Sequence, residues 1–105
     1  MNSALLAQVN LPLMASQGVS GGALERKVQP IYPPEARSAR LQGTVVLQVV
    51  IDEAGGVQNL RTVSGDAVLA GAAIDAVRQW RYQPYLLNGQ PVKMPIQITI
   101  NFTLP

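Results

Sequence analysis

The sequence predicts one small α+β domain: a three-stranded sheet with two helices packed on one face. Three observations support this fold class. Residues 96–102 alternate strictly between apolar and polar side chains, which is typical of a half-buried strand. Residues 43–52 are apolar on both faces, as in a central strand, and residues 69–80 carry an apolar stripe at helical spacing. At 105 residues the chain is long enough for one such domain.

Composition argues against catalysis and against nucleic-acid binding. The chain has no histidine and no cysteine, so the commonest general base, thiol nucleophile and transition-metal ligands are missing. Its net charge of +2 comes from scattered lysines and arginines without a basic run. We therefore expect no enzyme activity, no cofactor, no metal and no nucleic-acid partner.

Residues 1–24 are predicted to be a flexible N-terminal segment or linker, followed by the domain at residues 25–105. Two short apolar runs near the start are interrupted by Gln8, Asn10 and Pro12, and residues 16–22 are rich in glycine and serine.

The domain is predicted to begin with an extended arm that changes abruptly into a short helix. Pro30 and Pro33 fix φ and favour extended geometry over residues 25–31, with Gln29 exposed beside them. Proline is also tolerated in the first turn of a helix, so residues 34–40 are predicted to be helical.

Residues 43–52 are predicted to form the central strand, with Val45, Leu47 and Val49 in the core. A turn over residues 52–56 leads to a returning strand at residues 57–63.

Asp66 is predicted to cap a helix whose buried stripe ends on a large aromatic side chain. After it, Asn88-Gly89 is a strong signal for a tight turn. The stripe consists of Leu69, Ala72, Ala73, Ala76, Val77 and Trp80.

The last strand, residues 96–102, is predicted to lie beside the central strand and to leave its other edge free. A right-handed crossover through the helix places the strands in the order 57–63, 43–52, 96–102, and Pro91 and Pro95 agree with an edge position. Its core-facing residues are predicted to be Ile96, Ile98, Ile100 and Phe102.

An unpaired regular edge strand accepts an added peptide strand readily. Pro95 has no N–H, so its side of the strand is predicted to face outward. By the two-residue period, Gln97, Thr99 and Asn101 then direct their backbone groups to the incoming peptide.

Several motifs occur together in order: Tyr32-Pro33, Gly43-x-Val45, Ala76-x-x-x-Trp80-x-Tyr82-x-Pro84 and Asn88-Gly89. With them, residues 28–104 resemble the C-terminal domain of TonB-type energy transducers. The sequence departs from the family pattern at Val49, where an aromatic is frequent, and in the Gly55-Gly56 hairpin.

The resemblance implies a docking domain. Gln29, Pro30, Tyr32 and Pro33 match the region that contacts an outer-membrane transporter, and residues 96–102 match the strand that receives the transporter's TonB box. It also implies a periplasmic location, a tether to the inner membrane and force from an ExbB/ExbD-type motor. A homodimer formed by strand exchange is a further expectation. The alternative is a TonB-like interaction or sensory module attached to another membrane protein, such as a membrane metallopeptidase, without motor coupling.

Overall fold

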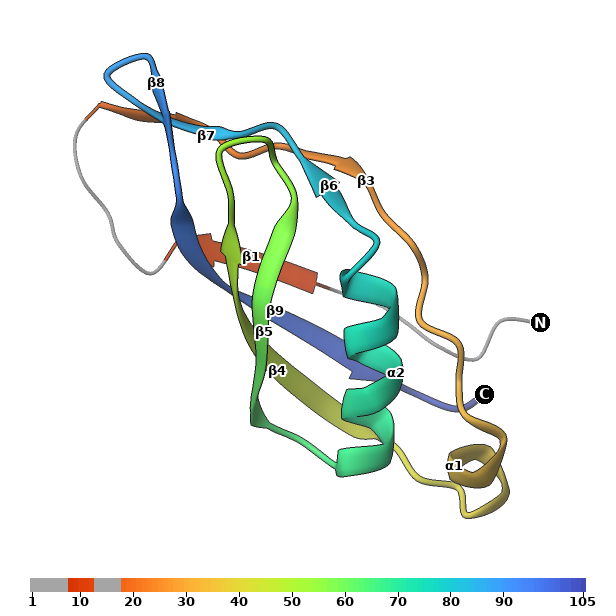
Figure 1. Ribbon diagram of the computed structural model, residues 1–105. Coiled ribbons are helices and arrows are strands. Elements are labelled where there is room, and N and C mark those ends of the chain that lie inside the picture. Colours follow the sequence, from red (N-terminus) through yellow and green to blue (C-terminus); the bar gives the residue numbers. More distant parts are fainter. Residues whose placement is uncertain (1–7, 13–17) are drawn as a thin grey trace.

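The computed structural model describes residues 8–12 and 18–105, which form a twisted antiparallel sheet covered on one face by helix (Figure 1). The main sheet has four strands, in the order β1 (Gln8–Pro12), β9 (Met94–Phe102), β4 (Gly43–Ile51) and β5 (Val57–Ser64). The last three confirm the predicted order, with β4 antiparallel to both neighbours.

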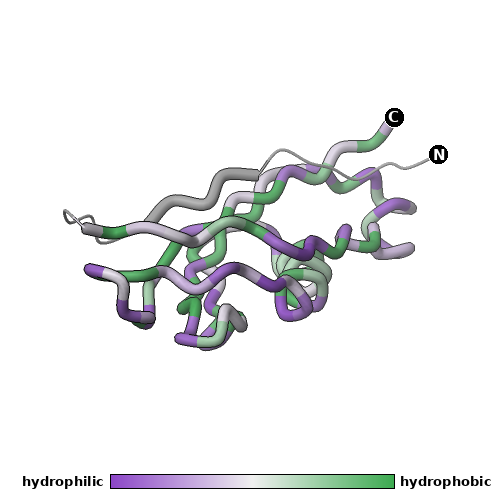
Figure 2. Tube along the Cα trace, turned by 90° about the horizontal axis from the view of Figure 1, so that it is seen from above, coloured by the Kyte–Doolittle hydropathy of each residue, from purple (hydrophilic) through white to green (hydrophobic). Residues whose placement is uncertain are grey.

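Strands β4 and β9 form the centre of the sheet because each has a complete apolar face. Leu47 lies opposite Ile98 and Val45 opposite Ile100, and all four are buried. The tube in Figure 2 changes repeatedly between hydrophobic and hydrophilic residues along its strands, as this alternation requires. The predicted core residues Val49 and Phe102 are buried as well.

Helix α2 (Ala67–Val77) covers the apolar face and contacts β4 and β5. The Asp66 side chain accepts hydrogen bonds from the backbone N–H groups of Val68 and Leu69, at 2.8 and 3.1 Å, which confirms the predicted cap. The helix ends three residues before Trp80, although the indole is buried as predicted. Of the rest of the predicted stripe, Leu69, Ala73, Ala76 and Val77 are buried and Ala72 is half-buried.

Short antiparallel strands pair residues 19–26 with the segment that follows α2. Strand β2 (Val19–Gly21) pairs with β7 (Tyr85–Leu87). Strand β7 then turns back and pairs with β8 (Gln90–Val92). Strand β3 (Leu24–Arg26) pairs with β6 (Arg81–Tyr82). The β7–β8 turn places Asn88 and Gly89 at φ of 52° and 84°, the left-handed geometry that Asn-Gly favours.

Helix α1 (Pro34–Ser38) follows the arm, which we define as residues 27–33. The arm runs in extended form beside α2, and α1 then lies at the end of the sheet with Ala36 buried. This confirms the predicted change from an extended segment to a helix.

The predicted free edge of the last strand is wrong, because β1 occupies it. The pairing is antiparallel and extends from Gln8 opposite Ile100 to Pro12 opposite Ile96. Strand addition depends on backbone groups, so a segment without an apolar pattern can form it. Within residues 1–24, which are predicted to be a flexible segment or linker, the structure contains β1, β2 and the first residue of β3. Residues 1–7 and 13–17 of this segment lie outside the described part.

Neither Pro91 nor Pro95 lies at a free edge of the main sheet. Pro91 lies in β8, which belongs to a separate hairpin. Pro95 lies in β9 opposite Val50 of β4, and β1 ends one position short of it. A proline is tolerated there if the pair with Val50 is one that exchanges no hydrogen bonds.

Candidate peptide-docking site

Two surfaces contain most of the residues that the sequence singles out for partner binding; Pro30 and Tyr32 are buried instead. One is the edge of β9 that faces β1, and the other is a groove between the arm and α2. Both are built mostly from backbone and small or polar side chains, so they suit recognition of another chain better than chemistry on a small molecule.

The side chains of β9 alternate between the core and a half-buried polar face. Ile98 and Ile100 are buried, whereas Gln97, Thr99 and Asn101 lie on the opposite face of the sheet. Asn101 is held by Thr44 on β4, whose hydroxyl lies 2.7 Å from the Asn101 amide oxygen. The polar residues are thus placed on one strand, as predicted.

The register supports the predicted direction of the β9 backbone groups through two prolines. In an antiparallel pair, opposed residues alternate between those that exchange hydrogen bonds and those that do not. Pro95 opposite Val50 and Pro12 opposite Ile96 each fit the second kind, since proline has no N–H. If both pairs are of that kind, the backbone groups of Gln97 and Thr99 are directed toward β1 and those of Ile98 toward β4, and this direction stays a prediction.

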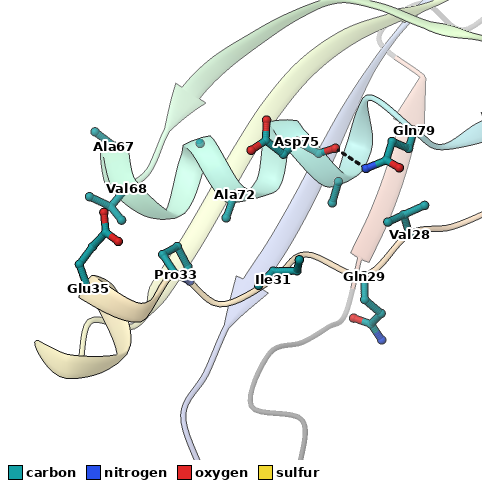
Figure 3. A pocket seen from close by; sticks show the side chains of 12 residues that line it. Val28, Gln29, Ile31, Pro33, Glu35, Ala67, Val68, Ala72, Asp75 and Gln79 are labelled. Atoms are coloured by element: carbon teal, nitrogen blue, oxygen red, sulfur yellow. Dashed lines mark hydrogen bonds between the residues drawn. The ribbon is translucent and has the colours of Figure 1, made fainter.

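The arm and α2 enclose an open groove of about 450 Å³ (Figure 3). On the α2 side the groove is lined by Gly71, Ala72 and Ala76, whose small size leaves space between the helix and the arm. Glu35 and Asp75 place acidic groups on its wall. The full lining is Val28, Gln29, Ile31, Pro33, Glu35, Ala67, Val68, Gly71, Ala72, Asp75, Ala76 and Gln79.

Two aromatic side chains hold the arm against the body of the domain. The Trp80 indole N–H donates to the Val28 carbonyl at 2.8 Å, and the Tyr32 hydroxyl donates to the Leu41 carbonyl. The Tyr32 ring also packs edge-to-face against Phe102, with ring centroids 5.6 Å apart. The arm is therefore fixed from both ends.

The predicted arm residues differ in accessibility. Gln29 is exposed, with its side chain directed away from α2 in Figure 3, and Pro33 is half-buried in the groove lining. Pro30 and Tyr32 are buried, so their side chains stabilise the arm. A direct role of any of these residues in binding stays a prediction.

Sequence reasoning missed Ile31, which is 81% exposed between two buried arm residues. Side chains of an extended segment alternate, so burial of Tyr32 directs Ile31 outward. The burial of Tyr32 is therefore the observation that predicts the exposure of Ile31. Val68 on α2 is also exposed and lines the same groove.

Within residues 8–12 and 18–105, no group of His, Cys, Asp or Glu residues is arranged to hold a metal ion. Two tyrosines, Tyr82 in β6 and Tyr85 in β7, have pKa values above the ordinary value of a phenol. Burial raises the pKa of Tyr82, with a smaller contribution from Tyr85, and burial also raises the pKa of Tyr85. Over the same described ranges, no helix has the length and apolarity that crossing a bilayer requires.

A sequence profile described as the Gram-negative bacterial TonB protein C-terminal matches residues 28–104. The chain belongs to this TonB C-terminal family. The matched range begins at the arm and includes β4, α2 and β9, whereas β1, β2 and β3 precede it.

Curated relatives agree with this assignment to the TonB family. Protein TonB of Vibrio cholerae is 35% identical over 107 residues, covering 92% of this chain and 44% of that protein. Protein TonB of Xanthomonas campestris is 38% identical over 77 residues, covering 71% of this chain and 34% of that protein. The chain thus spans less than half the length of these relatives.

The solution structure of the Pseudomonas aeruginosa TonB C-terminal domain has the same fold. It superimposes with a TM-score of 0.66 at 18% identity, covering 85% of this chain and 89% of that one. The predicted α+β architecture is therefore confirmed.

Proposed function

We propose that this chain is the docking domain of a TonB-type energy transducer. It binds the periplasm-facing TonB box peptide of an outer-membrane transporter as an added strand on β9. The observation that carries this proposal is the pairing of β9 with β1, because it demonstrates an edge that accepts five consecutive residues of extended chain. Family membership over residues 28–104 supports the same role.

The arm supplies a second contact in this proposal. Gln29 and Ile31 are exposed beside the groove, and the hydrogen bond from Trp80 to Val28 holds their backbone in place. A transporter that engages both the arm and β9 gains from a pre-ordered surface, since little chain entropy is lost on binding. The domain performs no catalysis and works by keeping hold of the added strand under load.

The remaining parts of the proposal follow from the family. The domain lies in the periplasm, is tethered to the inner membrane and transmits force from an ExbB/ExbD-type motor. A homodimer is proposed to form by exchange of residues 8–12 between the β9 edges of two copies.

The test compares Thr99→Pro with Ile98→Pro, using synthetic peptides that copy the periplasm-facing segments of the transporters of the source organism. Thr99→Pro removes a backbone donor on the accepting side, so we expect a folded domain that no longer binds peptide. Ile98→Pro removes a donor that faces β4, so we expect loss of the fold. Circular dichroism reports folding and fluorescence anisotropy reports binding.

Thr99→Val is the matched control, because it changes the same side chain and keeps the N–H. It should bind the peptides as the unmodified chain does. Normal binding by a folded Thr99→Pro variant would exclude strand addition at this edge. Unfolding of Thr99→Pro with survival of Ile98→Pro would show that the backbone direction is reversed.

A further inference from the structure

The edge of β9 that the proposed function assigns to a partner peptide is already occupied by the chain's own β1. The five residues of β1 lie along β9 from Ile100 to Ile96, and Figure 1 shows the two strands side by side. An external strand and β1 need the same backbone groups of Gln97 and Thr99. They cannot both be bound there.

We propose that β1 is an intramolecular competitor for the peptide-binding edge, so that a partner peptide binds by displacing it. This inference rests on the proposed function, and it adds how access to that site is regulated. The displaced unit is residues 8–12, and the occupant that replaces it is another extended peptide.

The contacts of β1 suit a strand that leaves without unfolding the domain. Its extensive contacts with other described elements are those with β9 alone, whereas β9 is also paired with β4 over nine positions. Segments held along a single edge belong to the part of a protein that opens at low free energy. The β4–β9 pairing and the cover provided by α2 do not involve β1.

A short connection makes even weak pairing effective in the intact chain. Only residues 13–18 separate β1 from β2, which is fixed by its pairing with β7. Short linkers give effective concentrations in the millimolar range, so a segment with millimolar affinity as a free peptide occupies the edge substantially when attached. A partner peptide must bind more strongly than that to replace it.

Displacement is tested with two variants of the full chain. Val9→Pro removes a backbone donor that the register directs toward Thr99, whereas Asn10→Pro, the matched control, removes one that points away from β9. Amide hydrogen exchange of Thr99, followed by NMR, reports whether β1 is docked. We expect exchange at Thr99 to increase at least about tenfold in Val9→Pro and to stay unchanged in Asn10→Pro.

Binding is measured with a synthetic copy of residues 6–13 and with the transporter peptides used above. If β1 covers the edge for about 90% of the time, its release raises the apparent affinity about tenfold. We expect this gain in Val9→Pro and none in Asn10→Pro.

Equal affinity of the transporter peptide for Val9→Pro and the unmodified chain would overturn the competition while leaving strand addition intact. Fast Thr99 exchange in the unmodified chain would also overturn it, because β1 would not be docked. A different result identifies failure of the proposed function: Val9→Pro exposes Thr99, binds the copy of residues 6–13, and binds no transporter peptide.

Discussion

Trp80 joins the core to the arm through one side chain. The indole is 1% exposed and also donates its N–H to the Val28 carbonyl. Trp80→Ala should lower the free energy of unfolding by about 3–5 kcal/mol, a large part of the stability of a small domain. Chemical denaturation measures this loss.

Gln83→Ala, at an exposed position nearby, is the control and should change the free energy of unfolding by less than about 0.5 kcal/mol. If Trp80→Ala stays as stable as the control and loses only peptide binding, Trp80 acts in recognition and the core assignment fails.

Gln29, unlike Trp80, has an exposed side chain, although the backbone next to it is held in place. Its side chain is exposed, and neighbouring Val28 is held by Trp80. Gln29→Ala should weaken transporter-peptide binding while the free energy of unfolding changes by less than about 0.5 kcal/mol. Thermal denaturation and anisotropy on one preparation separate the two effects. A fall of many degrees in melting temperature would show that Gln29 is structural.

Helix α2 is the element whose start depends most on a single side chain. Asp66 accepts two of the backbone N–H groups that a helix leaves unpaired at its beginning. Asp66→Ala should lower the free energy of unfolding by about 1 kcal/mol, and Asp66→Asn should recover most of it. Asp75→Ala, at an exposed position inside α2, is the control. Equal effects at Asp66 and Asp75 would contradict the cap.

The elements that the sequence predicted well are those defined by local pattern. Alternation specified β9, two apolar faces specified β4, and Asp66 marked the start of α2. Strand β1 could not be found in this way, because its pairing depends on an edge that exists only once the sheet has formed. The short strands β3 and β6 depend likewise on distant chain segments.

The candidate site was predicted unevenly for the same reason. Placing Gln97, Thr99 and Asn101 on one face required only the two-residue period. Burial of Tyr32 required knowing that Phe102 and the Leu41 carbonyl lie beside it. These contacts join residues from different elements, so no local pattern in the arm reveals them.

Stability of the whole molecule should fall in alkaline solution because of its buried phenols. Burial raises the pKa of Tyr82 and Tyr85 in the folded domain, while the unfolded chain ionises with a pKa of about 10. The contribution of the two neutral phenols to stability is therefore fully present below about pH 10 and is lost as the pH rises further. The loss is at most about 1.4 kcal/mol per pH unit for each tyrosine.

Denaturation at several pH values between 9 and 12 checks this dependence. Tyr82→Phe should show a smaller decrease above pH 10 than the unmodified chain, whatever its stability at neutral pH. The same slope in a Tyr82→Phe, Tyr85→Phe double variant would assign the alkaline loss to other groups.

The hydrogen bonds from Trp80 and Tyr32 to backbone carbonyls also determine how the domain responds to tension. Side chains rooted in the core grip the chain at Val28 and Leu41, on either side of α1. A pull applied upstream of β1 meets the pairing of β1 with β9, of β2 with β7 and of β3 with β6 before it reaches the core at Val28. The pairing of β1 is the first of these to carry the load because β1 lies farthest upstream, and the hydrogen bond from Trp80 holds the chain at Val28 after β2 and β3. The hydrogen bond at Val28 therefore limits how far a pull on the N-terminal segment disturbs the rest of the fold.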